Sequence, residues 1–357
     1  MKRRQRVTCV VMAAALGCWS AAPAGWGAGF SEVTPASKAA ALRGLAWLAA
    51  TQQRDGSWVT DTGRPDHLGL MGLACLAFMS AGSTPGKGEY GRQLSLGLKY
   101  IMDNQKPNGL LNIGPATYDM YNHGLATLTL SEAYGMSHDP RIKSKLVQAV
   151  DLIVECQSAD GGWTYQAVKG AHDTSICVME MMALRGAVNC GIYVPKETID
   201  KGVKWLLGRY NPKTGGFGYS SPHPTTGMTA AGAVSLQAAG KLTWDSKEGE
   251  PVRKSLDWLL ANTESKALPR AGYGSLGFYH AYYFAQCMFQ AGGKYWQQTY
   301  PQLRDNLVGM QQPSGYWSFG ATGPMMSTSV AVIILSIPNR YLPIFQEERD
   351  ESVSSER

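Results

Sequence analysis

Five of the six histidines in this chain of 357 residues share one position relative to its apolar segments. Each stands at or just before a run of small and apolar residues that we expect to be helical, and these five are His67, His123, His172, His223 and His280. If those helices begin at one end of the fold, the five imidazoles converge on one opening. Such a cluster could bind a metal, bind an acidic ligand or transfer protons, and helix N-termini would favour an anion there.

An acid and several tyrosines lie beside these histidines. Asp173 follows His172, and we expect both to project into one cavity together with His123 and His280, as its catalytic groups. The other candidates for the wall of this cavity are Tyr118, Asp119, Tyr121, Tyr279, Tyr282, His67 and His223. The alternative is structural. Each histidine would then be a turn residue bonded to nearby backbone groups, and Asp173 would cap the helix that starts at Thr174.

The elements that would hold these side chains form an internal repeat. Equivalent helical segments are centred on Trp47, Tyr100, Leu152, Trp205 and Trp258, so successive copies are 53, 52, 53 and 53 residues apart. A sixth, weaker copy runs over residues 303–310. Periods of this length are typical of architectures in which each unit buries its apolar face against the next unit.

Each unit has the same internal order. An amphipathic first helix ends near a glutamine, a turn with a glycine and an aromatic residue follows, and a second, more apolar helix completes the unit. We expect the second helices over residues 68–81, 124–134, 174–188, 226–239, 281–291 and 328–337. Glycines at positions 82, 135, 240 and 292 are placed to end four of them in the left-handed conformation. No stretch alternates with period two, so almost no sheet is predicted.

The polarity of the helices predicts how the units assemble. The second helices are apolar on nearly all faces, and a helix without a polar face must be surrounded by protein. Six such helices inside six amphipathic ones make two concentric rings, an all-α toroid. An open solenoid is the alternative, but it would expose one face of the second helices.

The charge of the chain excludes one class of partner. The formal charge is +6, and Lys2, Arg3, Arg4 and Arg6 supply four of these charges, which leaves +2 for the rest. No Lys/Arg cluster remains that could follow a phosphate backbone, so we expect no nucleic-acid partner.

The basic N-terminus is typical of an export signal. Residues 1–6 are basic, residues 7–16 are apolar, and small residues at positions 22–24 form a cleavage site. We therefore expect a signal peptide over 1–24, a linker over 25–36, one toroid over 37–345 and a disordered charged tail over 346–357. A lipoprotein acylated at Cys18 is the alternative, and the apolar run is too short to span a bilayer.

The remaining cysteines carry no metal or disulfide pattern. Five stay in the exported chain, an odd number without paired spacing: Cys75, Cys156, Cys177, Cys190 and Cys287. Because they lie in or at the ends of apolar helical runs, we interpret them as small buried side chains.

The turns resemble the QW motif, in which a glutamine is followed within a few residues by a glycine and then by a tryptophan. Full copies stand at Gln53/Trp58, Gln157/Trp163 and Gln312/Trp317. Over residues 37 to 340 the chain resembles the prenyltransferase and squalene-oxidase repeat proteins, which include squalene cyclases and the β subunits of protein prenyltransferases. The resemblance extends to an uncharacterised bacterial branch of that family, and it implies the α/α toroid fold.

The functional residues of these relatives are compared with this sequence position by position. Squalene cyclases protonate a double bond with the middle aspartate of a D-x-D-D-T motif, but His172 stands at that position here and an imidazolium is too weak an acid. The prenyltransferase zinc site implies Asp173, Cys177 and His280 as ligands of a divalent metal, although the family's D-x-C spacing is missing.

Three functions therefore stay open. The first is an exported protein similar to terpenoid cyclases and prenyltransferases that binds or transforms a small lipid-like or acidic ligand in the toroid cavity, without cyclising squalene. The second is a non-catalytic module that binds a ligand or a protein partner. The third is a polysaccharide lyase or hydrolase, because Tyr/His pairs suit proton abstraction next to a uronate.

The export signal makes a testable prediction. We expect the exported chain to start near Gly25, since cleavage should follow the small residues at positions 22–24. N-terminal sequencing of the protein recovered from outside the cytoplasm checks this. An exported product that still begins with Met1 would contradict it.

Overall fold

The computed structural model describes residues 31–59, 67–219, 223–240, 245–264, 277–318 and 323–346. The segments predicted as signal peptide, as the first part of the linker and as the tail after residue 346 lie outside these ranges. The second part of the predicted linker leads directly into a helix that begins at Pro35, and Glu32 accepts a hydrogen bond from Trp296 Nε1. None of the described helices is both long and apolar enough to cross a membrane.

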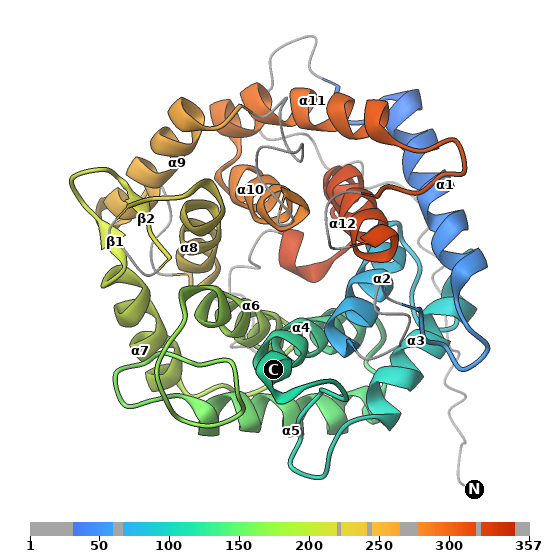
Figure 1. The fold of residues 1–357 in the computed structure, drawn as a ribbon, viewed down its shortest axis with the longest axis horizontal. Helices are drawn as coiled ribbons and strands as arrows, with labels where there is room; N and C mark the ends of the chain where they lie inside the picture. The colour runs from blue at the N-terminus through green and yellow to red at the C-terminus, as the bar shows by residue number, and fades with distance from the viewer. Residues whose placement is uncertain are drawn as a thin grey trace, which may run out of the picture. The chain divides into compact units, whose positions relative to one another are not determined.

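Twelve α-helices in the described ranges alternate between two layers (Figure 1). The outer helices are α1 (Pro35–Thr51), α3 (Gly91–Asp103), α5 (Pro140–Cys156), α7 (Lys196–Leu207), α9 (Glu250–Asn262) and α11 (Gly293–Met310). The inner helices are α2 (Leu68–Ser80), α4 (Asp119–Ser137), α6 (Thr174–Asn189), α8 (Thr226–Ala238), α10 (Gly277–Ala291) and α12 (Gly323–Ser336). The described strands are β1 (Tyr210–Asn211) and β2 (Gly216–Phe217), which pair antiparallel in one turn.

The inner helices form a closed ring. Helix α2 packs on α4, α4 on α6, α6 on α8, α8 on α10 and α10 on α12, and α12 returns to α2. Nearly every residue of α2 and α12 is buried, because these helices have no polar face and protein surrounds them. The outer helices encircle this ring, and α1 packs on both α11 and α12 (Figure 1). The predicted all-α toroid is confirmed.

A glutamine ties each of four turns to the next outer helix. Gln157, the C-cap of α5, donates from Nε2 to the carbonyl of Gly161 in its own turn, at 3.1 Å, and to the carbonyl of Thr198 in α7, at 2.9 Å. The same pair of bonds joins Gln52 to Gly56 and Gln93, Gln105 to Gly109 and Lys145, and Gln311 to Gly315 and Ala40. The last of these closes the ring, since it links the sixth repeat to the first.

The tie also requires a glycine in the turn. Gly161 has φ +102°, a conformation that side chains rarely adopt, and a Cβ there would stand 2.2 Å from the carbonyl oxygen of Lys201. Gly315 makes the equivalent approach to Arg43 in α1. The turn therefore lies backbone against backbone on the next outer helix.

Two glutamines of the predicted motif are displaced by one residue. The sequence has Gln52 beside Gln53 and Gln311 beside Gln312, and the motif predicted from the sequence uses the second glutamine of each pair. Helices α1 and α11 end at Thr51 and Met310, so the first glutamine of each pair is the C-cap that reaches the next repeat. The second one is exposed.

Three inner helices begin earlier than predicted. Helix α4 starts at Asp119 instead of residue 124, α10 at Gly277 instead of 281, and α12 at Gly323 instead of 328. Their first turns mix polar residues, glycine or proline with aromatic residues or methionine, so they lack the continuous run of small and apolar residues that follows in each helix. His123 and His280 consequently lie inside their helices and not before them.

Of the four glycines predicted to end inner helices, three have the left-handed conformation. These are Gly82, Gly240 and Gly292. Gly135 instead lies within α4, which ends with His138 in the left-handed conformation at φ 54°. The missing side chain of Gly135 makes room for Pro343, which lies 3.2 Å from the point where a Cβ on Gly135 would stand.

The segment after α12 packs against the ends of the inner helices. It contains the short helix η7 (Pro343–Phe345), which contacts α4 and α6. The backbone N–H of Ile344 donates to Glu132 Oε2 at 3.2 Å, and the ring of Phe345 packs edge-on against Phe289 of α10. In Figure 1 the red end of the coloured ribbon lies within the ring of inner helices.

The ring-closing tie predicts a stability effect. Gln311→Met removes two hydrogen bonds to backbone carbonyls, so we expect the free energy of unfolding to fall by about 2 kcal/mol. Denaturant unfolding followed by circular dichroism measures this. Gln312→Met, at the exposed neighbouring position, is the matched control and should change stability by less than about 0.5 kcal/mol. Equal losses in the two variants would refute the role given to Gln311.

Candidate functional site

Asp173 is the centre of a polar network at the start of α6. As the N-cap, its Oδ1 accepts from the backbone N–H of Ser175 at 2.8 Å and of Ile176 at 3.4 Å, and also from the Ser175 hydroxyl. Its Oδ2 accepts from the Tyr165 hydroxyl at 3.0 Å. The capping role that we held as the alternative is therefore present, and it is joined to further side chains.

Two more tyrosines extend this network to neighbouring repeats. The Tyr121 hydroxyl of α4 is hydrogen-bonded to Ser175 Oγ, and the Tyr219 hydroxyl before α8 is hydrogen-bonded to Tyr165. Because Ser175 and Tyr165 give their own protons to Asp173, each must accept the proton of its second partner. All the hydroxyl protons thus point toward Asp173, and the oxygens of Tyr121 and Tyr219 are left able to accept a hydrogen bond.

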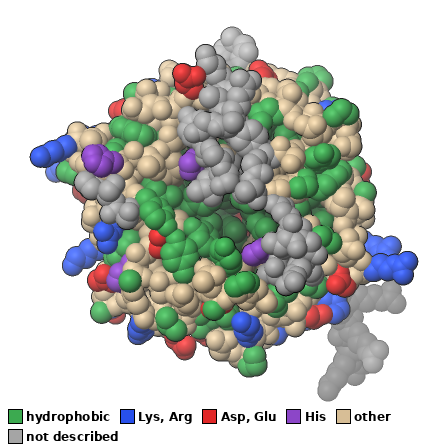
Figure 2. Space-filling view, in the orientation of Figure 1, with side chains coloured by type: hydrophobic (Ala, Val, Ile, Leu, Met, Phe, Trp, Pro, Cys, Tyr) green, Lys and Arg blue, Asp and Glu red, His purple; other side chains and the backbone are tan. Residues whose placement is uncertain are grey.

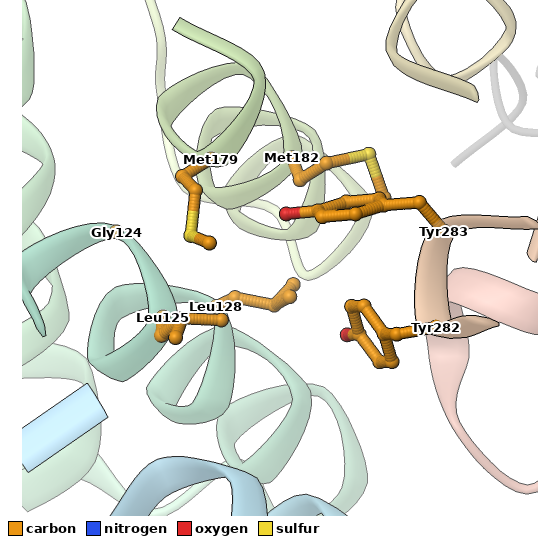
Figure 3. Close-up of a pocket in the computed structure, with 7 residues that line it drawn as sticks. All are labelled: Gly124, Leu125, Leu128, Met179, Met182, Tyr282 and Tyr283. Carbon is orange, nitrogen blue, oxygen red and sulfur yellow. The ribbon is translucent and has the colours of Figure 1, made fainter. Parts of the chain in front are cut away.

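The interior beyond this network is apolar and narrow. A pocket is lined by Gly124, Leu125, Leu128, Met179, Met182, Tyr282 and Tyr283, about one turn along α4 and α6 from the network (Figure 3). The two tyrosines come from α10 and face the leucines and methionines of α4 and α6 (Figure 3). Figure 2 shows hydrophobic side chains gathered around a hollow near the middle of one end of the ring.

The tyrosines of α10 complete the aromatic wall. The rings of Tyr279 and Tyr283 meet edge-on with centroids 4.7 Å apart, and those of Tyr282 and Tyr283 at 5.2 Å. Burial raises the pKa of Tyr279 well above its ordinary value, and the nearby Tyr121 and Asp173 raise it further. Burial also raises the pKa of Tyr121. Tyr121, Asp173 and Tyr279 therefore lie within electrostatic reach of one another, and these phenols remain neutral.

In the five repeats whose turns are described, a side chain of the inner helix accepts from the backbone N–H of the turn aromatic, or of Leu111 in the second repeat. His123 Nδ1 accepts from Leu111 at 3.1 Å, and Cys177 Sγ accepts from the N–H of Trp163 at 3.1 Å. The equivalent acceptors for Trp58, Phe217 and Trp317 are Met71, Thr229 and Thr328. His123 Nε2 is bonded to the carbonyl of Ala149 at 3.0 Å, so both of its ring nitrogens serve the fold.

His172 also faces the outer layer. Its Nε2 lies 2.8 Å from Asp160 Oδ1, its ring packs 5.9 Å from that of Trp205 in α7, and it fills the space left by the missing side chain of Gly162. The prediction that His123 and His172 project into the central cavity is wrong, because both are used to attach the turn to the outer helices.

The other three histidines occupy separate surroundings. His280 packs on Gly227 of α8, where a Cβ would stand 2.2 Å from its ring, and burial lowers its pKa. His67 is the N-cap of α2 and lies edge-on to Tyr118, with ring centroids 5.6 Å apart. His223 is exposed before α8. The structure therefore joins Asp173 with Tyr121 and Tyr279, but not with the histidines.

The proposed zinc ligands do not come together. Among the described residues there is no group of three His, Cys, Asp or Glu side chains that could hold a metal ion. Both oxygens of Asp173 accept hydrogen bonds, Cys177 accepts from Trp163, and His280 packs on α8. The cysteines in the described ranges are free thiols, and four of the five are buried, as predicted.

Sequence reasoning missed Ser175, Tyr165, Tyr219 and Tyr283. One signal was available. Tyr165 and Tyr219 each stand two residues after the turn aromatic, Trp163 or Phe217, and are 54 residues apart, so they occupy equivalent places in adjacent repeats.

Comparison with known proteins places this architecture among solved structures. No protein-family model matches the chain, and no curated protein matches it. An inactive variant of the α-1,6-mannanase of Salegentibacter, with two consecutive aspartates changed to asparagine and α-1,6-mannotriose bound, has a TM-score of 0.65 at 10% identity and covers 87% of this chain and 100% of its own. A family 76 glycoside hydrolase from Bacteroides thetaiotaomicron has a TM-score of 0.67 at 9% identity, over 87% of this chain and 78% of that one.

A second group of similar structures consists of terpene cyclases. The type II terpene cyclase MstE from Scytonema, in a variant with one aspartate changed to asparagine and geranylgeranyl dihydroxybenzoate bound, has a TM-score of 0.62 at 13% identity, over 86% of this chain and 98% of that one. This chain has the α/α toroid fold. At these identities the likeness shows the fold alone, which carries both sugar and prenyl chemistry.

The buried histidine makes a prediction about pH. Burial lowers the pKa of His123 to about 4 from 6.5, so the unfolded chain binds a proton that the folded chain refuses. Stability is therefore lost as the pH falls from about 6.5 to about 4, by roughly 3 kcal/mol. His123→Thr, which copies the acceptor of the fourth and sixth repeats, should flatten this part of the profile.

Denaturant unfolding over the same pH range measures the effect. His223→Thr, at an exposed position, is the matched control. If the wild-type and His123→Thr profiles run parallel, His123 does not carry the pH dependence.

Proposed function

We propose that this protein is an exported binding toroid that holds a small, prenyl-like ligand in its interior, with the polar end of the ligand at the Asp173 network. The observation that carries the proposal is the apolar lining of the pocket about one turn beyond that network, whose walls leave no room for a water molecule in this structure, so that a ligand must part them. Aliphatic and aromatic side chains favour an apolar chain, and the acceptor oxygens of Tyr121 and Tyr219 suit a hydroxyl group.

Proton-initiated cyclisation is a poorer fit. Protonating a double bond requires a strong acid whose proton faces the ligand. Both oxygens of Asp173 are occupied as acceptors, so this side chain has no proton directed at the pocket. His172 stands where a cyclase acid would be and is turned toward Asp160.

Sugar chemistry is also a poorer fit. The mannanase variant described above is inactive with two consecutive aspartates replaced, and this sequence contains no two consecutive aspartates. Glycosidases generally need two carboxylates facing one bond. A lyase would need a phenolate or an imidazole as base, but burial keeps the Tyr121 phenol neutral and His123 is bonded to backbone.

The terpene cyclase supports the ligand class at the level of the fold, since it holds a geranylgeranyl compound on a similar toroid. In this chain the tyrosines of α10 narrow the interior, and these are Tyr279, Tyr282 and Tyr283. A short chain is therefore favoured over a long one.

Binding of prenyl alcohols to the mature protein tests the proposal. We expect a one-to-one complex with geraniol or farnesol by native mass spectrometry and isothermal titration calorimetry, and none with α-1,6-mannotriose. Leu128→Trp fills the pocket and should abolish binding, whereas Ser175→Ala breaks the link between Tyr121 and Asp173 and should weaken it roughly fivefold.

The controls make the outcome decisive. Tyr193→Phe alters a tyrosine that is 83% exposed, away from the pocket, and should bind as the wild type does. Binding of mannotriose in place of the alcohols would overturn the proposal, as would prenyl binding that Leu128→Trp leaves intact. Incubation with squalene should give no cyclic product by gas chromatography above a heat-killed control.

A further inference from the structure

A second acid lies next to the pocket and takes no part in the Asp173 network. Glu180 projects from α6, is 0% exposed, and has no hydrogen-bond partner for either carboxyl oxygen. Buried polar groups are almost always paired, because an unpaired one loses its hydration without compensation. Among the described residues the other fully buried glutamate is Glu132, and one of its oxygens, Oε2, does have a partner in the backbone N–H of Ile344.

The carboxyl group of Glu180 lies against Gly124 of α4, which is one of the residues that line the pocket. Both of its oxygens are 3.2 Å from the point where a Cβ on Gly124 would stand, and Gly124 lines the pocket. Met179, the residue before Glu180, lines the same side, and Tyr283 faces it from α10 (Figure 3). The absence of a side chain at Gly124 is thus what gives the acid room beside the pocket.

The surroundings keep this acid neutral. Burial raises the pKa of Glu180 well above its ordinary value. The titratable groups that feel it electrostatically are Tyr283, Cys156 and Cys177, which are themselves uncharged acids. A neutral carboxyl offers one O–H donor and one carbonyl acceptor, and in an apolar site such a group can donate to an oxygen of a ligand.

We propose that Glu180 binds a second oxygen of the ligand, so that the toroid selects a short apolar chain with a hydroxyl at each end. The inference rests on the proposed function, since it needs an apolar ligand in the pocket. A hydroxyl can accept from the acid O–H and donate to its carbonyl, which satisfies both unpaired oxygens. One hydroxyl then meets the Asp173 network and the other meets Glu180.

The helix sets the length of such a ligand. Ser175 of the network and Glu180 are five residues apart on α6, so their levels differ by about 7.5 Å along the helix axis. A geraniol-sized chain spans this distance, whereas a geranylgeranyl chain exceeds it. Glu180 is therefore a specificity-determining residue for both the chemistry and the length of the ligand.

A matched pair of ligands tests this inference. Geraniol and geraniol with a second hydroxyl at the far end of the chain are titrated into the mature protein by calorimetry. We expect the wild type to bind the diol roughly tenfold more tightly. Glu180→Leu should remove this preference, so that the ratio of the two affinities falls to about one, whereas Glu180→Gln, which keeps a donor and an acceptor, should retain part of it.

Two further measurements keep the test independent of folding defects. Ser235→Ala removes another buried hydroxyl without a partner, outside the pocket, and should keep the wild-type preference. Burial raises the pKa of Glu132 to about 8, so that acid contributes a protonated carbonyl band to both proteins. The infrared difference between wild type and Glu180→Gln should therefore contain the band of Glu180, and the diol but not geraniol should shift it.

The outcomes separate the two proposals. If neither ligand binds the wild type, the proposed function fails and this inference fails with it. If geraniol binds but the diol binds no more tightly, or if Glu180→Leu keeps the preference, only the role of Glu180 is overturned.

Discussion

The glutamine tie that joins four of the described turns to the next outer helix is the constraint on which this structure depends. A single repeat has an inner helix without a polar face and cannot bury it alone. The glutamine amide, fixed at the helix C-cap, joins backbone carbonyls of two successive repeats, and the turn glycine lets their backbones touch. When Gln311 makes the same bonds to the first repeat, six locally equivalent units become one closed ring.

The same turn decides which side chains are available for chemistry. The backbone N–H of the turn aromatic needs an acceptor from the inner helix, and His123 and Cys177 supply it in two repeats. A methionine or a threonine provides this acceptor in other repeats. The position therefore requires a hydrogen-bond acceptor, and an imidazole is only one of the side chains that can provide it. Histidine and cysteine side chains are thereby used as structural acceptors, and the interior near the pocket is left to tyrosines and to two acids of α6, Asp173 and Glu180.

Those two acids have opposite surroundings on one helix. Asp173 receives hydrogen bonds from backbone and hydroxyl donors at the N-terminus of α6, where a carboxylate is favoured. Glu180 lies deeper, without a partner and next to apolar side chains. Apolar side chains of α6, among them Met179, lie between the two acids. The proposed ligand with a polar group at each end rests on this arrangement.

The sequence by itself determined the repeat, the alternation of the two kinds of helix and the closed toroid. The repeat period and the polarity of each helix are local properties, and they recur in every unit of the sequence. It offered the Asp173 cap of α6 only as an alternative, and it predicted buried cysteines, as four of the five described ones are. Only the tertiary structure decided which way each side chain faces. His123, His172 and Asp173 all lie near the starts of inner helices, yet the histidines turn to the outer layer and Asp173 turns to tyrosines of neighbouring repeats. Contacts between α4, α6 and α10 have no counterpart in sequence spacing, so neither Tyr283 nor Glu180 could be recognised before the ring was closed.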